Sequence, residues 1–220
     1  VAARRSHLDW VLGKVTSEDV GDFVPIPQYY DAQARLAWSP RKREYVEVGG
    51  LLSHDRIERS LLASDPIETK RESKTSGFNR VYLNYKRETD DGIASFTPFF
   101  GTDSSEVVSR FGAIPAELVQ DSTVYGLRTS WKGRAENWLA VGVGLDAEVV
   151  TSSIRRGGSV TTPPREGDIR VFGQLPSDQI NADDWTTTIA GLAPFAEADA
   201  ALFDDRLHLI PGLRIEPSMV

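Results

Sequence analysis

The chain has no cysteine, and this absence excludes several kinds of chemistry at once. Disulfides, cysteine-bound zinc, iron–sulfur clusters and a cysteine nucleophile are all ruled out. Histidine is also scarce, because His7, His54 and His208 are scattered and none has a neighbouring histidine at metal-ligand spacing. We therefore expect no metal site and no bound cofactor.

Long apolar runs are missing as well. The longest, residues 138–145, has eight residues, whereas a transmembrane helix needs about 18. No signal peptide is recognisable. Lys and Arg number 25 against 32 Asp and Glu, and the resulting net charge of -7 argues against a nucleic-acid-binding surface. Because the chain opens with Val1 and its single methionine is Met219, we expect it to be part of a longer sequence.

Helical periodicity is almost absent, and the best helix candidate is a turn or two at residues 115–120 inside an expected loop. Alternation of period two recurs instead and predicts strands. The nine strand candidates are residues 3–13, 28–39, 44–58, 76–88, 92–102, 122–133, 137–154, 184–203 and 206–217.

The connections between these strands alternate in length. Tight turns are expected at 40–43, 89–91, 134–136 and 204–205, and most contain the Pro or Asp that favours a hairpin turn. Long loops are expected at 14–27, 59–75, 103–121 and 155–183. This alternation is typical of an up-and-down barrel whose two ends differ.

The two faces of each strand differ in polarity. In residues 137–154, Leu139, Val141 and Val143 share an apolar face, while Asp146 and Glu148 lie on the other. In a bilayer the apolar face would meet lipid and the polar face a wet lumen, and a closed sheet pairs every backbone group there. We therefore predict an all-β fold, namely an incomplete antiparallel up-and-down transmembrane β-barrel. It has about nine strands, with long loops on one side, and forms one partial-barrel domain over residues 1–220.

The same parity assigns charged side chains of both signs to the lumen. Neighbouring strands can pair such charges across the wall. The predicted wall residues are Arg80, Lys86, Arg128, Lys132, Asp146, Glu148, Glu197, Asp199, Arg214 and Glu216, with Arg35 and Glu47 on the same face.

Aromatic residues near the tight turns support the membrane interpretation. Trp38, Tyr85 and Trp131 are placed as an interfacial girdle requires, and Trp185 is a candidate for the opposite girdle. The alternative is a soluble all-β binding module, for example a β-sandwich, whose polar face would meet bulk water.

The C-terminal stretch resembles the barrel of TonB-dependent outer-membrane receptors. Residues 194–197 read P-F-A-E and residues 205–214 read D-R-L-H-L-I-P-G-L-R, and both correspond to a hairpin of that family. The resemblance implies a barrel of about 22 strands filled by an N-terminal plug. It also implies uptake of a scarce nutrient, such as an iron–siderophore complex or cobalamin, with energy passed on by TonB. Within residues 1–220 no plug, TonB-interacting segment or closing aromatic-ended strand is recognisable.

No nucleophile, acid–base pair or phosphate-binding loop is present, so we do not expect an enzyme. Arg155, Arg156 and Arg165 fall in the longest expected loop. They are candidates for attracting an anionic siderophore or lipopolysaccharide phosphates, and ordinary solvated loop charges are the alternative.

We therefore predict a segment of a TonB-dependent receptor in the bacterial outer membrane. The implied partners are the lipid bilayer, an own or separate plug domain, TonB acting through that plug, and a small-molecule ligand such as an iron chelate. No nucleic-acid partner is expected. The alternative functions are a plug-less porin or structural barrel, and the soluble binding module.

Overall fold

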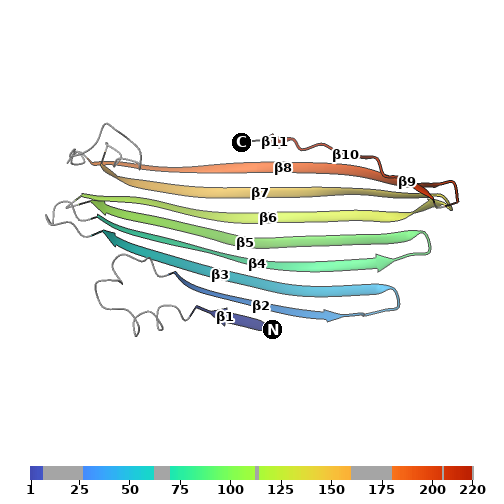
Figure 1. Cartoon of the computed structure of the whole chain (residues 1–220), viewed down its shortest axis with the longest axis horizontal. Helices are drawn as coiled ribbons and strands as arrows, with labels where there is room; N and C mark the ends of the chain where they lie inside the picture. Colours follow the sequence, from blue (N-terminus) through green and yellow to red (C-terminus); the bar gives the residue numbers. More distant parts are fainter. Residues whose placement is uncertain (7–26, 62–69, 112–113, 160–179, 205, 220) are drawn as a thin grey trace.

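The structure is a computed structural model that describes residues 1–6, 27–61, 70–111, 114–159, 180–204 and 206–219. These residues form one antiparallel sheet (Figure 1). Its strands are β1 (Ala2–Arg5), β2 (Gln28–Trp38), β3 (Glu44–Leu61), β4 (Lys70–Glu88), β5 (Gly92–Phe111), β6 (Ile114–Glu136), β7 (Leu139–Ser159), β8 (Ile180–Leu202), β9 (Leu207–Leu209), β10 (Gly212–Arg214) and β11 (Ser218–Met219).

Sequential strands lie side by side from β1 to β8, and β9, β10 and β11 all pair with β8. The three short strands share one register, with Leu209 opposite Ala200, Leu213 opposite Ala196 and Met219 opposite Ala190. They therefore form one strand, interrupted at prolines that cannot donate a ladder hydrogen bond. The predicted meander of nine antiparallel strands, not closed within the described residues, is confirmed.

The tight turns gather at one end of the sheet and are tied to one another. Thr89 N donates to Gly92 O at 2.7 Å, and Arg134 N reaches across to Asp91 O at 3.0 Å. Arg43, with φ 66° at the β2–β3 turn, forms an ion pair with Asp90 in the β4–β5 turn. The hydrogen bond and charge of Asp90 raise the pKa of the Arg43 guanidinium.

The strands extend well beyond their predicted bounds at the other end. The predicted loop 103–121 is wrong, because β5 continues to Phe111 and β6 begins at Ile114. The short helix expected at 115–120 is wrong for the same reason. Parts of the other expected loops, 59–61, 70–75, 155–159 and 180–183, are also strand. Most of the expected strand 3–13 and all but the last residue of loop 14–27 lie outside the described residues.

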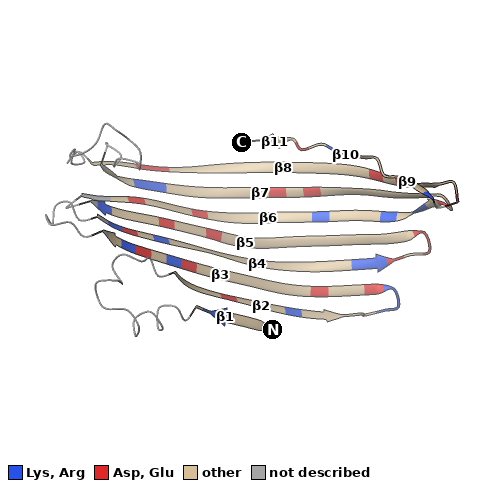
Figure 2. Cartoon of the chain, in the orientation of Figure 1, with Lys and Arg blue, Asp and Glu red and all other residues tan. Residues whose placement is uncertain are grey.

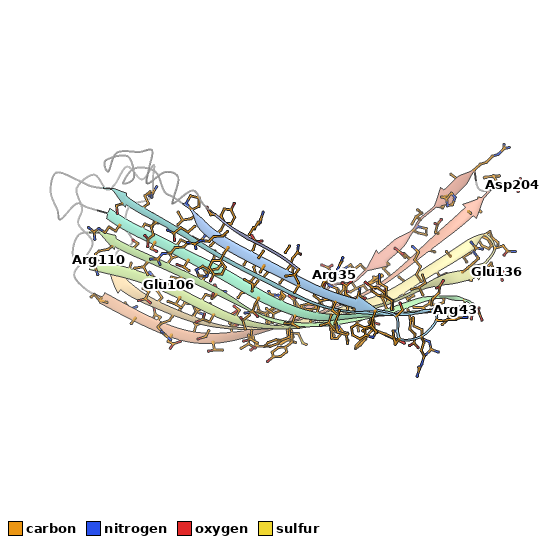
Figure 3. All side chains as sticks on the ribbon, turned by 90° about the horizontal axis from the view of Figure 1, so that it is seen from below. Arg35, Arg43, Glu106, Arg110, Glu136 and Asp204 are labelled. Carbon is orange, nitrogen blue, oxygen red and sulfur yellow. The ribbon has the colours of Figure 1, made fainter. Side chains whose placement is uncertain are left out.

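This sheet has almost no core of its own. Among the described residues, the buried hydrophobic side chains are Val124 and Ala193, while many large apolar side chains are exposed. The strands are twisted and bowed to one side, and Arg35 lies on the concave side (Figure 3). In the described part of the chain, no helix is long and apolar enough to cross a membrane. The apolar surface of a single layer must therefore be covered by something other than a second layer of these residues.

Candidate functional site

The register of the sheet sorts the side chains into an outer face and an inner face. Residues directly opposite each other on neighbouring strands lie on the same face. One row of the outer face runs through Trp38, Val46, Tyr85, Phe96, Thr129, Leu145 and Pro194. An adjacent row on the inner face runs through Tyr45, Lys86, Ser95, Ser130, Gly144, Phe195 and Arg214. A displacement of one residue thus changes an apolar row into a polar one.

From β4 to β8 the apolar part of the outer face ends at a row of short polar side chains. On β7 it extends from Leu139 to Val149, which matches the roughly 9–11 residues of a membrane-spanning strand. Immediately beyond it lie Asn79, Thr102, Thr123, Thr151 and Thr188 in one row. Asn79 Nδ2 donates to Thr102 Oγ1 at 2.6 Å, and the hydroxyls of Thr151 and Thr188 are 3.1 Å apart. We call the part of the sheet on the turn side of this row the banded half and the rest the extended half.

Aromatic side chains lie at both margins of the apolar band. Trp38, Tyr85 and Trp131 lie on the outer face near the turns, as predicted. At the other margin Tyr125 packs against Phe100, with ring centroids 5.0 Å apart. The prediction that Trp185 belongs to this second girdle is wrong. Trp185 is opposite Ile154, which puts it on the inner face and within the extended half.

On the inner face, Glu47 is the centre of a hydrogen-bonded cluster. Its carboxylate accepts from Tyr45 Oη at 2.5 Å and from Tyr82 Oη at 2.9 Å, and Arg35 Nε is 3.8 Å away. The Tyr82 ring covers its cross-strand partner Gly49, where a Cβ would lie 2.3 Å from Tyr82 Cζ. Glu47 is only 7% exposed although it lies in a single-layer sheet. These neighbours satisfy its carboxylate without a second layer of protein.

Two further inner-face sites stack an arginine, an aromatic ring and a glycine. Phe99 covers Gly126, and the guanidinium carbon of Arg128 lies 5.6 Å from the ring centroid. Phe195 covers Gly144 in the same way, and the Arg214 guanidinium is 6.0 Å from its ring. Glycine is required opposite each ring because a Cβ there would lie 2.0 Å or 2.3 Å from Cζ of Phe99 or Phe195. Cation–π contact holds both arginines near the rings, and Arg214 also donates hydrogen bonds to Asp146 and Glu216.

The residues predicted to line a lumen all lie on one face of the sheet, and several of them form ion pairs. Arg214 Nη1 donates to Asp146 at 2.9 Å, Lys132 Nζ to Glu197 at 3.0 Å, and Arg80 Nη2 to Asp103 at 2.8 Å. His208 Nδ1 lies 2.9 Å from Asp199, and Arg214 also contacts Glu216. Glu148 and Lys86 lie in the same face, opposite Gly126 and Tyr45 respectively. Within the described residues, no three His, Cys, Asp or Glu side chains lie close enough to hold a metal ion.

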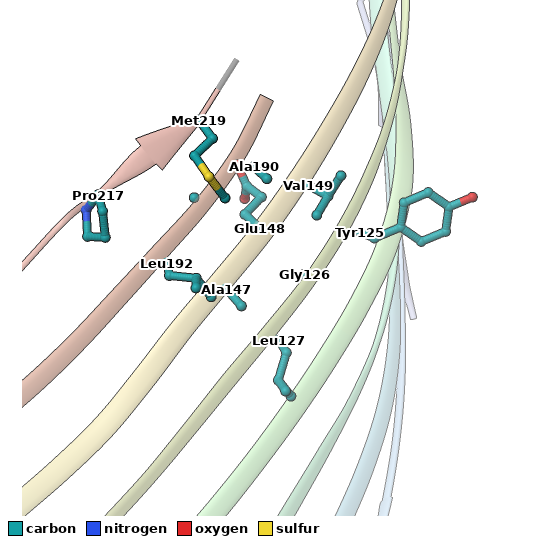
Figure 4. Close-up of a pocket in the computed structure, with 11 residues that line it drawn as sticks. Tyr125, Gly126, Leu127, Ala147, Glu148, Val149, Ala190, Leu192, Pro217 and Met219 are labelled. Carbon is teal, nitrogen blue, oxygen red and sulfur yellow. The ribbon is translucent and has the colours of Figure 1, made fainter. Parts of the chain in front are cut away.

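Two hollows lie on opposite faces of the same part of the sheet, over β6, β7, β8 and the last strand. The outer hollow, of about 480 Å³, is lined almost entirely by apolar side chains and includes Tyr125, Ala147 and Met219 (Figure 4). The inner hollow, of about 390 Å³, is lined by Phe99, Arg128, Asp146, Glu148, Arg214 and Glu216, among others. The outer hollow is therefore apolar and the inner hollow is charged, like the faces on which they lie.

Charged residues crowd the loop end of β3, as Figure 2 shows. Arg155 and Arg156, predicted to be loop residues, instead belong to β7 and lie opposite Asp184 and Asp183. They fall on different faces, and only Arg156 shares the inner face. Arg165 lies outside the described residues. The prediction that Arg155 and Arg156 lie in a loop is wrong because a strand without an apolar face shows no alternation that distinguishes it from a loop.

Solved structures show where this fold occurs. The chain resembles the outer-membrane transporter YddB from Escherichia coli, with 13% identity and a TM-score of 0.54 over 87% of this chain and 28% of that one. The siderophore receptor PiuA from Acinetobacter baumannii gives 8% identity and a TM-score of 0.48 over 87% of this chain and 39% of that one. The ferric citrate transporter FecA gives 12% identity and a TM-score of 0.47 over 89% of this chain and 36% of that one.

The likeness to YddB shows the fold, an antiparallel up-and-down sheet like part of the barrel of that outer-membrane transporter. The predicted fold class and the predicted resemblance are confirmed at this level. The chain spans 28% of the length of YddB. No family model matches the chain, and no curated protein matches it.

Proposed function

We propose that residues 1–220 form part of the wall of a transporter or receptor barrel in the bacterial outer membrane. The observation that carries this proposal is the apolar band of the outer face. On β7 the band extends from Leu139 to Val149 and stops at the threonine row that includes Thr151 and Thr188. A single layer with one apolar face of this length is stable in lipid as part of a closed barrel, whose charged face turns to an aqueous lumen. The fold shared with YddB supports the same function.

The finer proposal is energy-coupled uptake of a scarce nutrient such as an iron chelate. The resemblance of residues 184–217 to TonB-dependent receptors supports it, and such a barrel holds a plug through which TonB acts. The inner face offers that plug a wall of both charges, anchored by Glu47, Arg128 and Arg214. Arg156 is the one predicted ligand-contacting arginine in the described residues that also faces inward, and it is a candidate contact for an anionic ligand. The function is transport rather than catalysis.

Heat modifiability tests the membrane part of the proposal. The protein that contains residues 1–220 is extracted from outer membranes in mild detergent and run on a gel with and without boiling. A lipid-facing barrel retains its compact form unboiled and migrates faster than the boiled sample. Solubility without detergent together with unchanged migration would contradict the proposal and favour a soluble all-β binding module.

Bilayer conductance tests the transport part. The purified protein is inserted into a planar bilayer in potassium chloride, and the current is recorded at constant voltage. A wall closed around a plug gives no stable conductance, and removal of the plug by urea in the chamber opens one. A large, stable conductance without urea would contradict energy-coupled uptake and identify a passive pore.

A further inference from the structure

The outer hollow arises from the sizes of the side chains that line it. Ala147 on β7 is opposite Leu192, and in the next outward row Val149 is opposite Ala190 on β8. Met219 of the last strand is opposite Ala190 on its other side. The two alanines therefore form the floor of the hollow, and larger side chains stand around them (Figure 4).

The lining of the hollow restricts what fills it. Tyr125 and Leu192 at its rim are 54% and 49% exposed, yet the hollow of about 480 Å³ offers almost no polar surface. A water molecule held in a cavity needs two to four polar partners, and an apolar cavity takes up an apolar molecule instead. Water is therefore excluded as a stable occupant, and a hydrocarbon is favoured.

The position and extent of the hollow favour a chain-like hydrocarbon. Its lining residues come from β6, β7, β8 and the last strand, so it crosses three strand spacings, or about 14 Å at about 4.8 Å each. It lies within the apolar band of the outer face, which meets lipid under the proposed function. The acyl chains of the surrounding lipid are thus the hydrocarbon that reaches it.

A pair of hydroxyl groups lies directly beyond the hollow. Thr151 and Thr188 are the next outward residues after Val149 and Ala190, and their Oγ1 atoms are 3.1 Å apart. One O–H of such a pair donates to the other oxygen, and the second O–H has its hydrogen free to donate to an outside acceptor. The ester carbonyl that joins an acyl chain to the rest of a lipid is an acceptor of this kind. The hollow and the hydroxyl pair therefore match two adjoining parts of one lipid molecule.

We propose that the outer hollow is a binding site for one fatty-acyl chain of a membrane lipid in the leaflet at the loop end. The chain lies over Ala147 and Ala190, and its ester group accepts a hydrogen bond from Thr151 or Thr188. The inference rests on the proposed function and adds a defined lipid site to a face whose other contacts with lipid are non-specific. A lipid bound there stays with the protein when bulk lipid is removed.

Native mass spectrometry tests this retention. The full protein that contains residues 1–220 is purified in mild detergent, mixed with palmitoyl-oleoyl phosphatidylethanolamine and released from its micelle in the spectrometer. Ala147→Leu and Ala190→Leu each fill the floor of the hollow. Ala196→Leu is the matched control, because it makes the same change on the outer face of β8, opposite Val143 and away from the hollow.

We expect the wild-type protein to retain one lipid. Either filling variant should lower the apparent affinity at least about tenfold, which corresponds to about two fewer buried CH₂ groups. The control Ala196→Leu should bind the lipid as the wild type does. Equal retention by all four proteins would overturn the proposal, because it would show lipid bound without regard to the hollow.

Removal of the two hydroxyls tests the polar end of the site. Thr151→Val combined with Thr188→Val keeps the side-chain shapes and removes both donors. The double variant should lower the apparent affinity by about fivefold, as the loss of one hydrogen bond does. Unchanged affinity would overturn the placement of the ester group at these residues.

Photo-cross-linking identifies the occupant in the membrane itself. Tyr125→p-benzoylphenylalanine places a photoreactive group at the rim, and outer membranes that contain the full protein are irradiated. A lipid adduct on the peptide that contains residue 125 is expected. Cross-linking to a protein instead would overturn the proposal, because the hollow would then be a protein-docking surface.

Heat modifiability of the same samples separates this proposal from the proposed function. A heat-modifiable wild-type protein that retains no lipid and gives no lipid adduct would refute the lipid site and leave the barrel wall standing. A protein without heat modifiability would refute the proposed function, and the lipid site with it. Variants that are heat-modifiable like the wild type show that a loss of lipid is not a loss of folding.

Discussion

The two halves of strand β7 have the same backbone and different side chains. From Leu139 to Val149 every outward residue is apolar, and Asp146 and Glu148 lie on the inner face. Beyond Thr151 the strand continues to Ser159 with Ser, Arg and Gly on both faces. The hydrogen-bonded register against β8 does not change between the halves.

This difference shows that alternation records the surroundings of a strand rather than the strand itself. In the banded half the two faces meet different media, so side-chain polarity follows the period of the pleat. In the extended half of β7 neither face is continuously apolar, since Ser, Arg and Gly lie on both faces and Ile154 is the one large apolar residue, which indicates that both faces meet water. Backbone pairing maintains the strands there, together with ion pairs such as Arg59 with Glu72 at 2.8 Å and Arg56 with Glu58.

The largest predicted effect comes from placing a charge on the outer face of each half. Val143→Arg puts a guanidinium in the apolar band and should lower the free energy of unfolding by about 2–4 kcal/mol. Ser153→Arg places the same group on the same face and strand in the extended half, where a change within about 0.5 kcal/mol is expected. Urea unfolding in lipid vesicles, followed by tryptophan fluorescence, measures both. Equal losses at the two positions would show that the halves share one medium.

A smaller effect is expected from filling space at glycine. Gly144→Ala in the banded half places a Cβ 2.3 Å from the Phe195 ring and 2.7 Å from the Thr129 carbonyl oxygen. Overpacking of this kind costs about 1–3 kcal/mol. Gly157→Ala in the extended half meets nothing within 4 Å and should be neutral or slightly stabilising. The same unfolding assay decides the comparison, and a tolerated Gly144→Ala would refute the tight ring-over-glycine packing.

The smallest effect concerns a buried hydroxyl pair where the extended half begins on the inner face. Ser122 and Ser152 are 6% and 8% exposed, and their Oγ atoms are 2.8 Å apart. Each single change to Ala should cost about 1 kcal/mol because it leaves one hydroxyl unpaired. The double variant should cost less than the sum of the single variants, and a double-mutant cycle measures the difference. Strict additivity would mean that the two hydroxyls do not interact in solution.

The sequence predicts the banded half well and the extended half poorly, for a physical reason. Leu139 and Val143 lie on one face of an alternating pattern with a period of two residues. That pattern predicts the order of the strands, their apolar face and the inner-face position of Asp146. Arg155 and Trp185 carry no such signal, because polar and apolar residues do not alternate around them, and the predictions for both are wrong.

The stacked sites could not be predicted either. Phe99 meets Gly126 only because β5 and β6 pair in one register, and sequence separation does not reveal that register. The sequence does not reveal the cluster around Glu47 either, because Tyr82 belongs to the neighbouring strand β4 and its contact with Glu47 depends on the register. Alternation along each strand identifies the residues of the polar wall, whereas the contacts between them depend on the register of the paired strands.

The most direct test of the central claim is a spin-label scan along β7. The chain has no native cysteine, so single cysteines can be placed at successive positions from Leu139 to Ser159 in the full protein and labelled with a nitroxide in lipid vesicles. Collision rates with oxygen, which concentrates in lipid, should alternate with period two up to Val149, with maxima at the outward residues. Beyond Thr151 the alternation should vanish, and collision with a water-soluble nickel complex should dominate on both faces. Low oxygen collision at Val141, Val143 and Leu145 would contradict the account, since it would place the apolar face against protein rather than lipid.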